Sequence, residues 1–232
     1  MVRGAATVPM DRAEAFEGAL KLEPGRSALV VVDMQRAFLD RGEAMEVPAA
    51  REIVPQIRAL LDLFRGKRLP VVYTEFTYSE QVPILVGLLH PEHRRAAPGA
   101  PRGFGMPSSS CLLGEANVHV VPELAPEPDE LVVTKHYYDG FNGTVLDSAL
   151  RARGITHLVV TGTLTDICVL ATVIGGMNRE YRMTVVEDAT ATLWPEIQRA
   201  TLDIIGRAYA RVVSTKQLAE EIGRWSPSRA GL

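Results

Sequence analysis

The chain has 232 residues, of which 47% are hydrophobic and 23% are charged, a composition typical of a folded globular protein rather than a disordered one. Its 25 Lys and Arg residues against 28 Asp and Glu residues give a formal net charge of −3, so it lacks the overall positive charge with which proteins attract nucleic acid. Only two cysteines occur, Cys111 and Cys168, which excludes a disulfide framework and a Cys-rich zinc site.

The length predicts one domain over residues 1–232, with a short N-terminal extension (1–23) and a frayed tail (225–232). The extension mixes charged residues with alanines and contains no long apolar segment. The longest apolar run, 28–32, is far shorter than the ~20 residues of a membrane-spanning helix. We therefore expect no membrane partner and a cytoplasmic location.

Six short, β-branched runs recur along the chain, at 28–32, 70–74, 131–134, 157–161, 183–187 and 210–213. Each is too short for a helix and almost continuously apolar, which is typical of a strand buried on both faces of a sheet. Because helical patterns lie between the runs, we predict an α/β, three-layer, Rossmann-like fold with a six-stranded, mostly parallel sheet and helices on both faces. Residues 75–130 are rich in Pro and Gly and are interpreted as an insertion that builds a pocket wall or a subunit contact.

The helices are predicted from apolar spacing and from capping signals. A spacing of 3.6 residues predicts a helix over 53–64, and a further helix is expected over 166–180. The capping signals are Thr144 with Asp147, Ser214 with Gln217, and Pro195 as a first-turn residue.

Open α/β sheets bind ligands at the carboxyl ends of their strands, and three reactive side chains follow such ends. Asp33 follows the first run and is interpreted either as a general base or as the N-cap of the next helix. Lys135 follows the third run and is either a site ammonium or a surface lysine whose stem covers apolar residues. Cys168 lies near the start of a predicted helix, where the helix dipole and a nearby ammonium would favour a thiolate nucleophile; the alternative is a small buried hydrophobe.

The three residues are more informative together than singly. Nucleophilic catalysis needs a nucleophile, a group that accepts its proton, and a group that stabilises charge. A thiol, a carboxylate and an amine at three strand ends of one sheet satisfy that requirement.

Four segments carry a resemblance to a known family: 28–35 with Phe38, 135–141, 161–172 and 187–189. In order and spacing over about residues 24–222, the chain resembles the isochorismatase-like cysteine hydrolase superfamily, which includes N-carbamoylsarcosine amidase and the ureidoacrylate and biuret hydrolases.

The resemblance implies a catalytic triad of Asp33, Lys135 and Cys168 and a cis peptide bond between Thr163 and Leu164. It also implies that the backbone N–H groups of Leu164 and Cys168 form an oxyanion hole. The implied substrate is a small amide, ureido or carbamoyl compound that is cleaved through a thioester, with no cofactor. The implied assembly is a homodimer or homotetramer.

Departures from the family pattern bear on metal and substrate. Metal-dependent relatives carry histidines after the second strand, whereas residues 74–78 contain none. His90 and His93 lie farther on and are interpreted as part of a solvated loop, so we predict no metal. Asp139 either accepts hydrogen bonds from a substrate or caps the turn that follows it.

The rest of the pocket is predicted from its aromatic residues. Phe38, Tyr138 and Phe141 are expected to line it, with core packing as the alternative for each, and Gln35 is expected to hold Asp33. Two other functions stay open: an isochorismatase-type enol ether hydrolase that uses Asp33 as an acid, and a non-catalytic binding module on the same fold. Cys111 has no partner arrangement that suggests a role.

Overall fold

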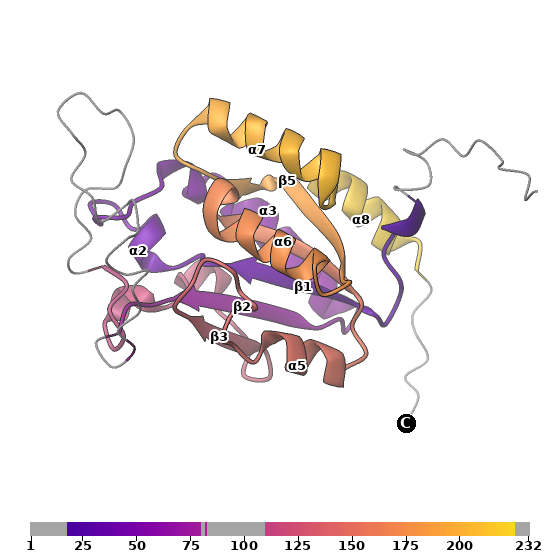
Figure 1. Cartoon of the computed structure of the whole chain (residues 1–232), viewed down its shortest axis with the longest axis horizontal. Helices are drawn as coiled ribbons and strands as arrows, with labels where there is room; N and C mark the ends of the chain where they lie inside the picture. The colour runs from indigo at the N-terminus through magenta and orange to yellow at the C-terminus, as the bar shows by residue number, and fades with distance from the viewer. Residues whose placement is uncertain (1–17, 80–81, 83–109, 226–232) are drawn as a thin grey trace, which may run out of the picture.

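The structure is a computed structural model that describes residues 18–79, 82 and 110–225 (Figure 1). Its six strands are β1 (Ser27–Val32), β2 (Val71–Phe76), β3 (Leu131–Lys135), β4 (His157–Thr163), β5 (Arg182–Ala191) and β6 (Arg211–Val213). They form one sheet in the order β3-β2-β1-β4-β5-β6, and all neighbouring pairs are parallel. The predicted six-stranded α/β sheet is confirmed. The strand order runs outward in opposite directions from β1 and β4, so a topological switch point lies between these two strands.

Helices cover both faces of the sheet (Figure 1). The α-helices are α2 (Arg36–Leu39), α3 (Val54–Gly66), α5 (Leu146–Ala152), α6 (Leu170–Met177), α7 (Pro195–Ala208) and α8 (Thr215–Gly223). The shorter helical elements are η1 (Pro48–Arg51), η3 (Ala116–Val118), η4 (Pro122–Leu124) and a π-helical turn, η5 (Thr165–Val169). In the described part of the chain, none of the helices has the length and apolar character needed to cross a membrane.

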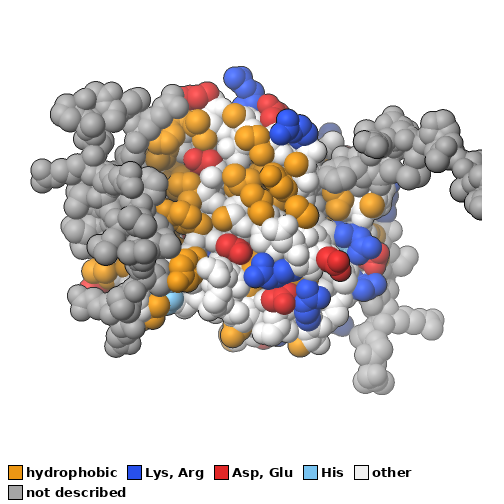
Figure 2. Space-filling view, in the orientation of Figure 1, with side chains coloured by type: hydrophobic (Ala, Val, Ile, Leu, Met, Phe, Trp, Pro, Cys, Tyr) orange, Lys and Arg blue, Asp and Glu red, His pale blue; other side chains and the backbone are white. Residues whose placement is uncertain are grey.

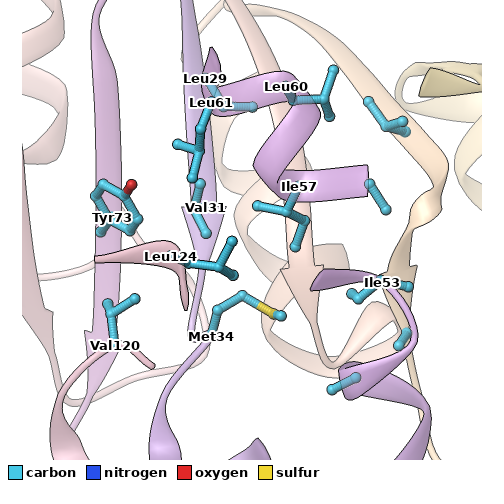
Figure 3. Packing of buried hydrophobic residues seen from close by; sticks show 14 of the residues in the cluster. Leu29, Val31, Met34, Ile53, Ile57, Leu60, Leu61, Tyr73, Val120 and Leu124 are labelled. Carbon is cyan, nitrogen blue, oxygen red and sulfur yellow. The ribbon is translucent and has the colours of Figure 1, made fainter. Parts of the chain in front are cut away.

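The side chains of β1 divide the core into two clusters, because successive residues of a strand point to opposite faces. Leu29 and Val31 pack on the face covered by α3 and α8, where Ile57 of α3 is also fully buried (Figure 3). Val30 and Val32 pack on the other face, with buried side chains from α5, α6 and α7. Burial of β1 on both faces explains its uninterrupted apolar sequence.

Three local predictions need correction, while the Ser214–Gln217 capping box is present as predicted. Val145, not Thr144, occupies the N-cap of α5, although the Thr144 hydroxyl accepts a hydrogen bond of 3.2 Å from the Leu146 N–H. The Asp147 carboxylate accepts hydrogen bonds from Arg151 and Tyr181. The helix expected over 166–180 is η5 followed by α6.

The segment interpreted as an insertion begins after β2, one of whose residues is Phe76. The strand continues to Phe76 because its last residues pair with β3.

The outward face of α6 is unusually apolar for a surface helix. Figure 2 shows hydrophobic side chains gathered over α6, whose residues Leu170, Ala171, Ile174 and Met177 are half-buried. The spacing of these residues repeats about every helical turn, so they form one stripe.

Candidate active site

The strand register brings the predicted residues to one edge of the sheet. Val32 pairs with Thr74 across β1 and β2, and Phe76 pairs with Lys135 across β2 and β3. Asp33 follows β1 directly and has a φ of 49°, a left-handed conformation that Asp tolerates better than most residues. The site therefore forms at the carboxyl ends of adjacent strands, beside the switch point between β1 and β4.

Asp33 and Lys135 form a buried ion pair. Lys135 Nζ lies 2.8 Å from Asp33 Oδ2, and neither side chain is exposed. The other carboxylate oxygen, Asp33 Oδ1, accepts a hydrogen bond of 2.6 Å from the Thr74 hydroxyl. The N-cap interpretation of Asp33 is wrong, since Gln35 precedes α2, and so is the surface interpretation of Lys135.

The Lys135 ammonium is held by further contacts. Nζ donates to the Tyr137 backbone carbonyl at 3.1 Å and lies 4.9 Å from the centre of the Phe76 ring, a cation–π arrangement. Burial opposes the charged form, but attraction to Asp33 and interaction with Cys168 outweigh it and raise the pKa of Lys135 above its ordinary value. Lys135 is therefore a fixed positive charge at neutral pH.

Cys168 lies in η5 and is 5% exposed. Burial raises the pKa of the Cys168 thiol well above its ordinary value; the Lys135 ammonium lowers it and the Asp33 carboxylate raises it. Burial and the Asp33 carboxylate thus oppose the thiolate that the sequence favours, whereas the Lys135 ammonium supports it. A base beside the thiol is therefore needed to remove its proton.

The segment before Cys168 contains the expected cis peptide bond, between Thr163 and Leu164. The Leu164 carbonyl accepts hydrogen bonds from the N–H groups of Ile167 (3.1 Å) and Val169 (3.0 Å), the residues on either side of Cys168. The Asp166 carboxylate accepts a hydrogen bond from the hydroxyl of Thr192, the residue that follows β5. These contacts fix the turn that presents Cys168.

The predicted pocket residues occupy different places. Gln35 does not hold Asp33: its amide nitrogen donates to the carbonyls of Phe76 (2.9 Å) and Val118 (2.6 Å), which ties β2 to η3. Phe38 is buried in the core cluster on the α3 face. Tyr138 is half-buried and stacks on Phe76, with ring centres 6.3 Å apart. The Phe76 ring in turn contacts Lys135, so Tyr138 adjoins a neighbour of the ion pair.

Phe141 and Asp139 are engaged by neighbours in the core and in their own turn. Phe141 is 3% exposed and stacks on Tyr181 in the second core cluster, which matches the core-packing alternative; the same cluster contains Cys168. The Asp139 carboxylate accepts a hydrogen bond from the Phe141 N–H at 2.8 Å, which matches the turn-capping interpretation. The same carboxylate fills the space beside Gly175 in α6, where a Cβ atom would lie 2.4 Å from it.

The described residues contain no group of three or more His, Cys, Asp or Glu side chains arranged to hold a metal ion. His90 and His93 lie outside these residues, so the expected absence of a metal stays a prediction. Cys111 is a free, fully buried cysteine in the core, and burial raises the pKa of its thiol.

Comparison with known proteins places this site in a family. A model described as the isochorismatase domain matches residues 27–217. The chain belongs to the isochorismatase family. The ureidoacrylate amidohydrolase RutB of Caulobacter segnis is 29% identical over 224 residues, which cover 89% of this chain and 90% of that protein.

Two solved structures with the same fold are more than 25% identical in sequence to this chain. A cysteine hydrolase from Pseudomonas syringae pv. phaseolicola aligns with a TM-score of 0.77 and 28% identity, covering 88% of this chain and 95% of that one. The N-carbamoylsarcosine amidase from Thermoplasma acidophilum aligns with a TM-score of 0.65 and 32% identity, covering 82% of this chain and 96% of that one.

In this member of the isochorismatase family, two neighbours of the ion pair were missed by sequence reasoning: Thr74 and Phe76. Both lie at the end of β2: Thr74 directly before, and Phe76 inside, the segment 75–130 that was interpreted as an insertion. Their position in the sequence could have indicated this role. Because β2 is parallel to β1 and beside it, the end of β2 lies next to the residue that follows β1.

Proposed function

We propose that this chain is a cysteine amidohydrolase that cleaves a C–N bond of a small amide, ureido or carbamoyl substrate through a thioester. The observation that carries the proposal is the buried cluster in which Asp33 pairs with Lys135 and both act on the Cys168 thiol. The names of two relatives, a ureidoacrylate amidohydrolase and an N-carbamoylsarcosine amidase, support the same class of bond.

The first half of the proposed reaction forms the thioester. The Cys168 sulfur attacks the substrate carbonyl carbon while its proton moves to the Asp33 carboxylate, as the raised pKa of the thiol requires. The carbonyl electrons move to oxygen, and the oxyanion accepts hydrogen bonds from the backbone N–H groups of Leu164 and Cys168. The C–N bond then breaks, Asp33 returns the proton to the leaving nitrogen, and ammonia or an amine departs.

The second half releases the acid. Asp33 takes a proton from water, the resulting hydroxide attacks the thioester carbonyl, and the C–S bond breaks as the proton returns to sulfur. Lys135 keeps its charge throughout and balances the negative charge of Asp33 or of the sulfur. Of the predicted lining residues, Tyr138 is best placed to contact the substrate, because it packs on the ring that adjoins Lys135.

The experiment is a screen of small amides, ureides and carbamoyl compounds for ammonia release by the wild-type protein and Cys168→Ala. We expect at least one compound to be hydrolysed by the wild type, and Cys168→Ala to lose at least about a thousandfold of that rate. Cys111→Ala is the control for removal of a buried thiol that also lies within reach of the Asp33 and Lys135 charges, and it should retain activity because its side chain packs in the core cluster. Full activity of Cys168→Ala would refute the thioester route, and cleavage of an enol ether by that variant would indicate the acid mechanism of Asp33.

A homodimer or homotetramer stays a prediction for this protein. Light scattering coupled to gel filtration would measure the mass of the assembly. The apolar stripe of α6 offers a position at which to introduce a charge, for example Ile174→Glu, when the contact surface is sought.

A further inference from the structure

The Thr74 hydroxyl contacts Asp33 at two points. It donates to Asp33 Oδ1 at 2.6 Å, and it accepts a hydrogen bond of 3.3 Å from the Asp33 backbone N–H. Both residues are fully buried. One hydroxyl thus bridges the main chain and the carboxylate of the same residue, which restricts the side-chain torsions of Asp33.

The hydrogen bond from Thr74 gives the two carboxylate oxygens of Asp33 different surroundings. Oδ1 is occupied by Thr74, whereas Oδ2 faces the Lys135 ammonium at 2.8 Å. Oδ2 is the oxygen that Thr74 does not hold, so it is the one available to accept the thiol proton. The β-branched side chain of Thr74 is stiff about χ1, which suits it to hold a fixed direction.

We propose that Thr74 is a positioning residue of this site: its hydroxyl locks the Asp33 carboxylate so that Oδ2 points at the proton of the Cys168 thiol. The inference rests on the proposed function and adds a residue to it. Thr74 touches Asp33 and not the reacting atoms, so it acts through the general base. A general base contributes only when it lies within hydrogen-bond reach of the proton it removes, and loss of direction should therefore slow proton transfer.

The test is alkylation of Cys168 by iodoacetamide at pH 7, followed by peptide mass spectrometry, because this reaction also needs the thiol proton to leave and requires no substrate. Thr74→Val keeps the shape and removes the hydroxyl, and Thr74→Ser keeps the hydroxyl. We expect Thr74→Val to lower the alkylation rate about tenfold, toward the value of Asp33→Asn, and Thr74→Ser to stay within about twofold of the wild type.

Thr161→Val is the matched control. Thr161 is another fully buried strand threonine, but its hydroxyl donates to the Val30 carbonyl, at 3.3 Å, and not to a site residue. It should leave the alkylation rate unchanged. Alkylation of Thr74→Val at the wild-type rate or faster would overturn the proposal, as would an equal loss in Thr161→Val.

Turnover gives a second readout on whichever amide the wild type hydrolyses. Thr74→Val should lower kcat by about ten- to a hundredfold and change KM less than about twofold, since orientation of the base matters to the reaction and not to binding. An effect confined to KM would contradict the positioning role. If the wild type hydrolyses none of the compounds, the proposed function fails, while the alkylation rates still decide whether Thr74 orients Asp33.

Discussion

Lys135 Nζ and Asp33 Oδ2 lie 2.8 Å apart at a place where neither side chain reaches solvent. Each charge was removed from water when the chain folded, and the opposite charge of the partner is the main compensation, beside the hydrogen bonds that Asp33 accepts from Thr74 and Lys135 donates to the Tyr137 carbonyl. The pair therefore links the stability of the fold to the chemistry of the site.

The first prediction concerns removal of one charge. Lys135→Met should lower the free energy of unfolding by about 3–5 kcal/mol at pH 7, because it leaves the Asp33 carboxylate buried without a counter-charge. Urea denaturation measures the change. The double variant Asp33→Asn with Lys135→Met should recover part of the loss, since it removes both charges. A loss below about 1 kcal/mol in Lys135→Met would show that the pair is not buried as described.

The sequence predicted the features of this site that depend on local pattern, and it did not predict those that depend on packing between distant residues. Asp33 and Lys135 follow runs whose strand character is evident from sequence, so their meeting at one sheet edge could be predicted. The effect of burial on the Cys168 pKa could not, because it depends on how completely residues distant in the chain enclose the thiol. Phe141 illustrates the same limit, since its neighbour Tyr181 lies 40 positions away.

Gly162 is a position where the fold tolerates only glycine. Its φ is 110°, and a Cβ atom there would lie 2.0 Å from the backbone oxygen of Val32, directly before Asp33. Gly162→Ala should therefore abolish folding or displace Asp33, with soluble yield and thermal unfolding as measurements. Gly154→Ala is the control, because Gly154 has a φ of 68° but open space around it. The control should lose only about 1–2 kcal/mol; an equally small loss in Gly162→Ala would contradict the close approach.

Thr184 offers a stabilising substitution away from the site. It is fully buried in β5, and its hydroxyl has no hydrogen-bond partner among the described residues. Thr184→Val should raise the free energy of unfolding by about 1 kcal/mol, because a buried unpaired hydroxyl costs free energy. Thr161→Val should instead destabilise, since it loses the hydrogen bond to Val30. Chemical denaturation of both variants checks the opposite signs, and a loss of stability in Thr184→Val would be the contrary result.

His157 predicts a pH dependence of stability. It begins β4, is 1% exposed, and Nε2 accepts or donates no hydrogen bond within the described residues, its nearest acid being Glu23 at 4.0 Å. Burial, with smaller contributions from Arg182 and Arg26, lowers the pKa of His157 below its ordinary value, although Glu23 and Glu221 act in the opposite direction. The folded protein thus holds this imidazole neutral.

A lowered pKa of His157 in the folded state determines the direction in which stability changes with pH. Below about pH 6.5, the unfolded chain binds a proton on His157 that the folded chain does not, so the free energy of unfolding falls as the pH decreases toward the folded pKa. The slope from this one group is at most about 1.4 kcal/mol per pH unit. His157→Gln should flatten the decline between pH 7.5 and 5, measured by urea denaturation at several pH values. Parallel pH profiles for the variant and the wild type would mean that His157 takes up its proton equally in both states.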